Sequence, residues 1–259
     1  MKIAIFKRKE NKEIVELLMG EAKKYHYSFD EENPDIVFCV GGDGTFLRAV
    51  HKYLDKLDKI KFIGINSGTL GFFYDFFKED IPSIFKMLEE KEFILLKQRL
   101  LKGVAKYNEE EMTFFAVNEI RLENPFRTII TDVSIDDEKL ERYRGNGLIV
   151  CSPLGSSAYN KSLGGAIIDH DLEVLELTEV AGIQNNVTHS LGSSLILKGD
   201  KTISFEGELV NSVVGYDFSS YHKEEALKKL SISYSDKEVK VITSKEHSYI
   251  KKIKRSFVA

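Results

Sequence analysis

The chain has 259 residues, a net charge of -4, and 42% hydrophobic and 30% charged residues, a composition typical of a globular protein with one large core or two modest ones. The mild negative charge excludes a global basic field that recruits nucleic acid or an anionic membrane, and no stretch approaches the roughly 18 apolar residues of a membrane span. Cys39 and Cys151 lie in apolar runs and Met1 leads directly into a strand-like run, so we expect buried free thiols, no secretory segment and a cytoplasmic protein.

The first hundred residues alternate between strand and helix patterns. Apolar runs predict strands at residues 3–6, 35–40 and 61–65. Helical spacing predicts helices at 11–25 and 45–54, and a third one that carries Ile84, Phe85 and Leu88. Such alternation builds a parallel sheet, whose ligands bind at the carboxyl ends of the strands.

The most informative segment is residues 36–45, Ile-Val-Phe-Cys-Val-Gly-Gly-Asp-Gly-Thr. Five apolar residues in a row predict a strand buried on both faces, and the glycines that follow let the backbone come close to a phosphate. A helix that begins after them favours anions at its N-terminus. Asp43 is then a carboxylate among groups that attract phosphate, which fits a general base or a group that orients a hydroxyl. The alternative is a Gly-Asp-Gly surface turn without chemistry.

A second glycine-rich loop follows the strand at 61–65. It reads Gly-Ile-Asn-Ser-Gly-Thr-Leu-Gly-Phe-Phe at residues 64–73. Both loops fall where parallel strands end, which supports a ligand site at this edge of the sheet. The first loop, at 41–45, lacks the spacing and the lysine of the Walker phosphate loop and does not match the dinucleotide fingerprint.

After about residue 96 the pattern changes to short strands divided by turns. Strands are expected at residues 100–107, 113–122, 128–135, 148–152 and 202–205, and at 230–234 and 239–242 as a hairpin about Ser235-Asp236. Leu172, Leu175 and Glu176 suggest one helix within 160–181. We therefore expect an α/β domain at residues 1–96 and a β-rich domain at 97–239, with the site in the cleft between them. The tail at 240–259 is expected to pack back on the first domain.

Asn118 and Glu119 interrupt an apolar run that predicts a buried strand. A buried carboxylate needs a partner. That partner is either a ribose diol, whose two hydroxyls a carboxylate accepts, or a structural ion pair with Arg121 or Arg127. The spacing alone leaves both alternatives open.

The segment at 144–166 runs from a strand into a turn rich in serine and glycine, followed by a helix start and a glycine pair. Small residues let a flat ring approach the backbone, and Tyr159 offers a stacking face or a hydroxyl donor. A nucleophilic serine is the alternative, but the Gly-x-Ser-x-Gly elbow is missing and no histidine is placed to form a triad. The six histidines show no metal-ligand spacing, so no zinc site is expected.

Three motifs, in this order and spacing, resemble the bacterial NAD kinase family. They are Gly-Gly-Asp-Gly-Thr at 41–45, Asn-Glu at 118–119 and Ser-Pro-Leu-Gly-Ser-Ser-Ala-Tyr-Asn-Lys-Ser-Leu-Gly-Gly at 152–165. Further similarity at 64–72 and 177–181 extends the resemblance over residues 36–183. It implies phosphorylation of the adenosine ribose 2′-hydroxyl of NAD, giving NADP, with magnesium and ATP, or polyphosphate, as the donor. It also implies an α/β domain with a parallel sheet, a β-rich domain and assembly as a homodimer or homotetramer.

The resemblance assigns roles to individual residues. Asp43 would activate the 2′-hydroxyl, and Gly42 and Gly44 would lie along the pyrophosphate. The adenine pocket and the ribose contacts would come from six further residues, Phe72, Asn118, Glu119, Ser157, Ala158 and Tyr159. Arg144 and Asn146 would bind elsewhere on the dinucleotide, and no protein ligands for a resident metal are implied.

The chain departs from the family pattern at several positions. Many relatives have Asp in the Arg-Gly-Asp-Gly segment where this chain has Asn146, and Leu154 replaces a small hydroxyl residue. Asp169-His170 replaces His-Pro, and a histidine near Asp217 is missing. Two alternatives follow: a non-catalytic NAD(P) sensor, motivated by Asn146 and Leu154, and a lipid kinase that shares the first motif.

Overall fold

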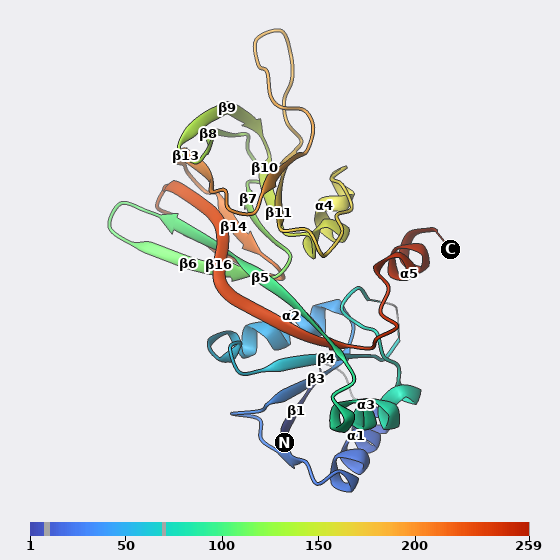
Figure 1. Ribbon diagram of the computed structural model, residues 1–259. Helices are drawn as coiled ribbons and strands as arrows, with labels where there is room; N and C mark the ends of the chain where they lie inside the picture. The colour runs from blue at the N-terminus through green and yellow to red at the C-terminus, as the bar shows by residue number, and fades with distance from the viewer. Residues whose placement is uncertain (8–10, 69–70, 259) are drawn as a thin grey trace. The chain divides into compact units, whose positions relative to one another are not determined.

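The computed structural model describes residues 1–7, 11–68 and 71–258 and divides into two compact units (Figure 1). Unit 1 comprises Met1–Gln98 and Lys237–Ala259, and unit 2 comprises Arg99–Asp236. The chain passes between them within two long strands, β5 (Ile94–Lys106) and β16 (Leu227–Thr243). Thr69 and Leu70 of the predicted second glycine-rich loop lie outside the described residues.

Unit 1 is built on a parallel sheet with the strand order β2-β1-β3-β4-β16. Its other strands are β1 (Lys2–Lys7), β2 (Ser28–Phe29), β3 (Ile36–Gly41) and β4 (Lys61–Asn66). Gly41 of β3 pairs with Asn66 of β4, so both glycine-rich loops leave the sheet side by side. This register places the two loops at one edge, as the sequence predicts.

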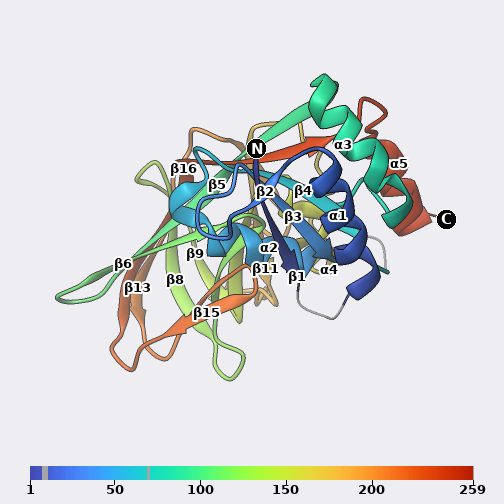
Figure 2. The same cartoon turned by 90° about the horizontal axis from the view of Figure 1, so that it is seen from below.

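Helices α1 (Lys12–Lys24), α2 (Asp43–Lys52) and α3 (Ile81–Glu90) of unit 1 each bury an apolar face. Unit 1 also contains the short helix α5 (Tyr249–Ile253) and the turns η1 (Leu54–Lys56), η2 (Lys78–Asp80) and η4 (Lys254–Val258). Helices α1 and α3 lie side by side (Figures 1 and 2). Leu18 of α1 and Phe85 of α3 are completely buried in one cluster with Phe38 of β3. The predicted elements of the first hundred residues are confirmed, and the ends that the sequence assigned differ by at most two residues.

Unit 2 consists of antiparallel strands around a common core. One sheet has the order β12-β11-β10-β7-β14-β15, and its strands are β7 (Glu119–Glu123), β10 (Gly147–Cys151), β11 (Val174–Val180), β12 (Leu195–Lys198), β14 (Val213–Tyr216) and β15 (Ser219–His222). The second contains β16, β13 (Ile203–Leu209), β8 (Ile129–Ile135) and β9 (Glu138–Gly145), and β5 pairs with β6 (Glu111–Ala116). Val150 of the first sheet and Phe205 of the second are completely buried in the same cluster.

The helix expected within 160–181 is wrong for most of its length. The segment contains a single turn of helix, α4 (Tyr159–Ser162), followed by strand β11, which pairs with β10. Leu172, which suggested helical spacing, is 54% exposed, whereas Glu176 is completely buried and accepts hydrogen bonds from Asn160 and the backbone of Ala166. Pairing with β10 therefore overrides the local spacing.

Two strand predictions are also wrong in detail. The hairpin about Ser235-Asp236 does not form, because β16 continues through these residues and the buried Ser235 hydroxyl donates to the Leu100 carbonyl at 2.9 Å. The strand expected at 113–122 is divided into β6 and β7 at Val117 and Asn118. A turn-forming residue can therefore lie within a strand when its side chain forms hydrogen bonds there. An apolar run can be divided into two strands where its backbone forms hydrogen bonds outside the sheet.

Candidate active site

The glycine-rich turn of unit 1 joins the carboxyl end of β3 to the start of α2. β3 ends at Gly41 and α2 begins at Asp43, with Gly42 in an extended conformation between them. A Cβ atom added at Gly42 or Gly44 would meet open space. The turn therefore leaves room for a ligand at a helix N-terminus, where anions are favoured.

The Asp43 carboxylate is held by two backbone hydrogen bonds from the second loop. Its Oδ2 accepts the N–H of Phe72 at 3.0 Å, and its Oδ1 accepts the N–H of Phe73 at 3.2 Å. A Cβ atom at Gly71 would lie 2.3 Å from Asp43 Oδ1, so only glycine fits there. Burial raises the pKa of the Asp43 carboxyl, while both N–H donors and the charge of Lys252 oppose that rise. An oriented carboxylate with raised proton affinity fits a general base.

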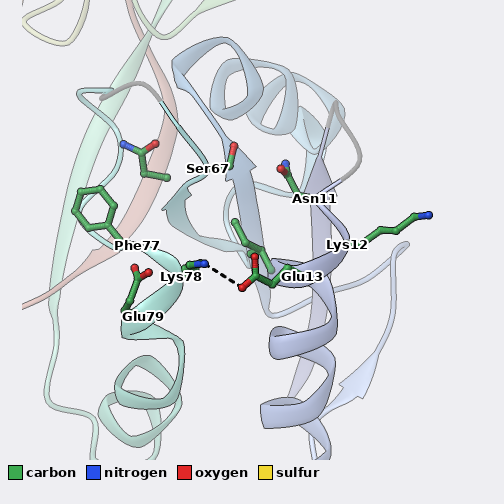
Figure 3. Close-up of a pocket in the computed structure, with 9 residues that line it drawn as sticks. Asn11, Lys12, Glu13, Ser67, Phe77, Lys78 and Glu79 are labelled. Atoms are coloured by element: carbon green, nitrogen blue, oxygen red, sulfur yellow. Dashed lines mark hydrogen bonds and ion pairs between the residues drawn. The ribbon is translucent and has the colours of Figure 1, made fainter.

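Unit 1 also holds a cavity of about 450 Å³ beside the start of α1 and the end of β4 (Figure 3). The lining residues come from the start of α1, the end of β4 and η2, and they are Asn11, Lys12, Glu13, Ile14, Asn66, Ser67, Phe77, Lys78 and Glu79. Lys78 Nζ lies 2.9 Å from Glu13 Oε1. Asn66 is only 5% exposed, and its Nδ2 has no hydrogen-bond partner within the described part of the chain. Since an unpaired buried donor destabilises the fold, this amide indicates a ligand with acceptor oxygens.

In unit 2, the backbone before β7 is held by a buried carboxylate. Asp217 accepts the N–H of Val117 at 2.9 Å and the N–H of Asn118 at 2.7 Å. These two bonds take the place of ladder hydrogen bonds and end β6 at Ala116. The Asn118 Oδ1 is buried without a partner among the residues that the structure describes, so it can accept a hydrogen bond from a ligand.

Glu119 is 3% exposed and uses only one of its two oxygens. Its Oε1 accepts from Arg121 Nη1 at 2.7 Å, whereas Oε2 has no partner in the described residues. The ion pair with Arg121 is therefore formed, and the second oxygen still suits a hydroxyl donor. Burial raises the pKa of Glu119 to about 7, with Arg121 opposing and the charge of Asp217 adding to the rise.

We expect Glu119 to make stability depend on pH. Between its ordinary pKa of 4.5 and about 7 in the folded protein, the folded state holds a proton that the unfolded chain has lost. The free energy of unfolding therefore falls as pH rises through this window, by on the order of 3 kcal/mol, and levels off above it. Denaturant unfolding of wild type and Glu119→Gln across this range measures the effect. A difference between the two proteins that stays constant with pH would contradict it.

The serine-rich turn packs directly against Asn118. Ser152 donates its N–H to the Asn118 carbonyl at 2.9 Å and its hydroxyl to the Val117 carbonyl at 2.7 Å. A Cβ atom at Gly155 would lie 2.2 Å from the Asn118 carbonyl oxygen. This close approach explains the glycine and fixes the turn beside Asn118.

The predicted ring-binding residues follow that turn. Ser157 ends η3 (Gly155–Ser157), and Tyr159 begins α4 after Ala158. Tyr159 is 38% exposed, and its ring centroid lies 5.5 Å from the Arg121 guanidinium carbon. Because Arg121 also bonds Glu119, the structure brings Tyr159, Glu119 and Asn118 into one cluster.

Arg144 and Asn146 have different surroundings. The Arg144 side chain is exposed. Asn146 donates its Nδ2 to the Asn124 carbonyl at 3.1 Å and its N–H to the Val180 carbonyl at 3.0 Å. The side-chain amide is therefore engaged within the fold, and an aspartate at this position has no N–H to donate.

Three residues that the sequence did not single out support these clusters: Asp217 in unit 2, and Asp75 and Lys252 in unit 1. Asp217 accepts hydrogen bonds from residues 100 and 99 positions earlier in the sequence. Lys252 donates a hydrogen bond to the carbonyl of Phe72, 180 positions earlier in the sequence. Contacts at such separations leave no local pattern, so the sequence carried no signal for them.

Comparisons with known proteins agree with this geometry. Family models match the ATP-NAD kinase N-terminal domain at residues 5–93 and the ATP-NAD kinase C-terminal domain at residues 117–244. The NAD kinase of Lysinibacillus sphaericus is 40% identical over 200 residues, which cover 76% of each chain. The NAD kinase of Leuconostoc citreum is 32% identical over 261 residues, which cover all of this chain and 98% of the relative.

Two solved structures share the fold. The yeast NADH kinase complexed with NADH has a TM-score of 0.84 at 19% identity, covering 98% of this chain and 86% of its own. An Archaeoglobus fulgidus NAD kinase in complex with ATP has a TM-score of 0.79 at 21% identity, covering 98% of this chain and 99% of its own. The two family models identify the chain as a kinase, and its α/β domain with a parallel sheet and its β-rich domain have the fold of these structures. The chain belongs to the NAD kinase family, which confirms the family resemblance and the fold class.

The described residues contain no group of three or more His, Cys, Asp or Glu side chains placed to hold a metal ion. Over the same parts of the chain, every helix is too short or too polar to cross a membrane.

Proposed function

We propose that this enzyme transfers the γ-phosphoryl group of ATP to the 2′-hydroxyl of the adenosine ribose of NAD, giving NADP and ADP. The observation that carries the proposal is Asp43, a partly buried carboxylate oriented by two N–H donors beside an open glycine turn. As the hydroxyl oxygen bonds to the γ-phosphorus and the bond to the ADP oxygen breaks, Asp43 accepts the hydroxyl proton.

Unit 2 supplies acceptors and a ring surface that suit the adenosine part of NAD. Asn118 Oδ1 and Glu119 Oε2 are buried acceptors without partners in the described chain, and ribose hydroxyls and the adenine amino group are donors. Tyr159, partly exposed beside Arg121, is proposed to stack on the ring, with Ser157 and Ala158 next to it.

Other residues keep the roles that the family resemblance implies. Phe72, Gly42 and Gly44 are proposed to contact the dinucleotide, and so are Arg144 and Asn146.

The donor is proposed to use the cavity between the start of α1 and the end of β4. Lys12 and Lys78 bring positive charge to its lining beside the carboxylates of Glu13 and Glu79, and the Asn66 amide, which has no partner among the described residues, suits a phosphate oxygen. Magnesium is proposed to arrive bound to the ATP phosphates, as part of the substrate. Magnesium in such sites is held largely by phosphate and water oxygens.

Lys78→Ala is expected to raise the KM for ATP by about tenfold, the effect of losing one charge-assisted hydrogen bond to phosphate. The Kd for NAD should stay within a factor of two or so. Lys86→Ala is the matched control, since Lys86 lies exposed on α3 and outside the cavity. An unchanged KM for ATP in Lys78→Ala would mean that ATP binds outside this cavity.

The reaction is tested by incubating the purified protein with NAD, ATP and magnesium and reading NADP through an NADP-specific dehydrogenase. We expect NADP and ADP in equal amounts. If no NADP forms with ATP or polyphosphate while calorimetry still detects NAD binding, the protein is a sensor instead.

We also propose a homodimer or homotetramer in the cytoplasm. The location is supported by Cys39 and Cys151, which are both buried free thiols, as suits a reducing compartment. Light scattering during size exclusion measures the assembly.

A further inference from the structure

Lys252 of α5 is a buried lysine with two specific partners. It is 6% exposed, and its Nζ lies 2.9 Å from Asp75 Oδ1 and donates to the Phe72 carbonyl at 2.7 Å. A buried ammonium group persists only where charge and hydrogen bonds compensate its lost hydration. The two partners of Lys252 therefore fix its position.

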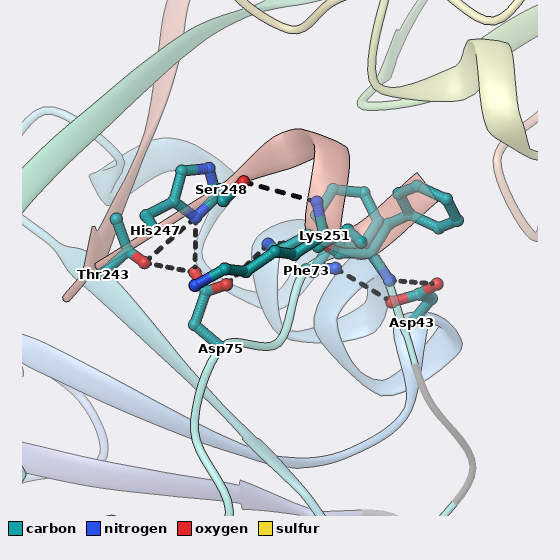
Figure 4. Close-up of polar contacts among 9 residues, drawn as sticks. Asp43, Phe73, Asp75, Thr243, His247, Ser248 and Lys251 are labelled. Atoms are coloured by element: carbon teal, nitrogen blue, oxygen red, sulfur yellow. Dashed lines mark hydrogen bonds and ion pairs between the residues drawn. The ribbon is translucent and has the colours of Figure 1, made fainter. Parts of the chain in front are cut away.

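Asp75 is held on its other side by the C-terminal segment. Its Oδ2 accepts from the Thr243 hydroxyl and lies 3.1 Å from His247 Nδ1 (Figure 4). Burial opposes ionisation of Asp75, but the hydrogen bonds and the charge of Lys252 outweigh it and hold the pKa of Asp75 well below its usual range. Asp75 is thus a fixed anion that anchors Lys252.

One peptide group connects Lys252 to Asp43. The carbonyl of the Phe72–Phe73 peptide accepts from Lys252, and the N–H of the same peptide donates to Asp43 Oδ1. Hydrogen bonds at both ends of one peptide polarise each other, so a cation at the carbonyl strengthens the donation to Asp43. The Phe72 and Phe257 rings, 5.4 Å apart and tilted, add a second contact between this loop and the C-terminal segment.

The close approach of Gly71 leaves the connection little freedom. Because a Cβ atom there would lie 2.3 Å from Asp43 Oδ1, the loop and the carboxylate are in direct contact. A small movement of the Phe72–Phe73 peptide therefore displaces Asp43 with it.

We propose that Lys252, anchored by Asp75 and His247, is a positioning residue that holds the Phe72–Phe73 peptide and, through it, the Asp43 carboxylate. This inference rests on the proposed function, in which Asp43 takes the hydroxyl proton. It assigns the C-terminal segment a part in phosphoryl transfer that acts through the position of Asp43.

Lys252→Met tests the proposal, with Lys251→Met as the matched control because Lys251 is the exposed neighbour on the same helix. We expect kcat to fall by about tenfold or more, with the KM for ATP nearly unchanged, as for a misplaced catalytic group. Lys252→Arg should recover part of kcat, and Lys251→Met should match wild type.

The pH profile of kcat separates positioning from a loss of stability. The titratable groups around the Asp43 carboxylate are Tyr74, whose hydroxyl donates to the Gly42 carbonyl, and Lys252, with Asp75 and His247 beyond it. Losing the lysine charge removes an influence that opposes the raised pKa of Asp43. The acidic limb of the profile should therefore move to higher pH in Lys252→Met and stay in place in Lys251→Met.

A double variant guards against misfolding from an unpaired Asp75. Asp75→Asn with Lys252→Met leaves a neutral pair, and its kcat should stay low although its thermal unfolding approaches that of wild type. Wild-type kcat and pH profile in either variant would overturn the positioning role. An inactive wild type would instead overturn the proposed function itself, so the two failures are distinguishable.

Discussion

Asp43→Asn should lower kcat for NADP formation by at least about a hundredfold, the lower end of what a general base contributes. The asparagine keeps the size of the side chain but cannot take the hydroxyl proton. Its oxygen can still accept from Phe72 or Phe73, while its NH₂ group faces the other N–H, so some loosening of this loop is expected. Steady-state kinetics with saturating ATP give kcat, and calorimetry should show a nearly unchanged Kd for NAD.

Asp35→Asn is the control for this experiment. Asp35 Oδ2 accepts the Lys2 N–H at 2.7 Å, so the substitution disturbs the same kind of contact away from the glycine turn and outside the cavity. We expect wild-type kcat. If Asp43→Asn also retained kcat, another group would have to take the proton, and the carboxylate would have only a structural role.

The sequence predicted the elements of unit 1 because they carry local signals. β3 is buried at all five apolar positions from Ile36 to Val40, which produces the continuous run seen in the sequence. α1 and α3 bury one stripe each, which produces helical spacing. Pattern and packing agree there, so local reasoning was sufficient.

In unit 2, local sequence patterns gave wrong predictions for segments whose secondary structure depends on pairing between strands that are distant in the chain. β11 forms although its sequence suggested a helix, because β10 and β12 pair with it on both sides. β16 runs through Ser235, a turn-forming residue whose hydroxyl bonds the Leu100 carbonyl. These contacts join residues far apart in the chain, and no window of sequence contains both partners.

The same division applies to the candidate site. The residues proposed to act on substrate stand in recognisable motifs, since a carboxylate among glycines or an Asn-Glu pair in a buried strand is chemically conspicuous. The residues that hold these side chains in place do not belong to recognisable motifs. Lys252 stands in a lysine-rich stretch of the sequence that carries no local signal for burial, yet it is buried against Asp75 and Phe72.

Asp217→Asn should be the most damaging single change in unit 2. Asp217 accepts the N–H groups of Val117 and Asn118 with separate oxygens, and asparagine offers only one acceptor. We expect the free energy of unfolding to fall by about 1–3 kcal/mol, the effect of leaving one buried donor unpaired. The Kd for NAD should rise by about tenfold, or roughly 1.4 kcal/mol, because Asn118 and Glu119 lose their fixed backbone. Denaturant unfolding and calorimetry measure the two effects.

The choice of asparagine separates the hydrogen bond from backbone strain. Asp217 has φ of 47°, in the left-handed region that asparagine tolerates. Asp137 has φ of 66° and a 92% exposed side chain. Asp137→Asn is therefore a control with the same backbone conformation, and it should change neither the free energy of unfolding nor the Kd for NAD.

The charge of Asp217 also raises the pKa of Glu119, so removing that charge should move the pH window in which Glu119 affects stability to lower pH. A loss of stability without that shift would mean that Asp217 stabilises the fold but does not affect the pKa of Glu119. Both effects together would show that Asp217, which binds the backbone N–H groups before β7, also controls the protonation of Glu119 in the site.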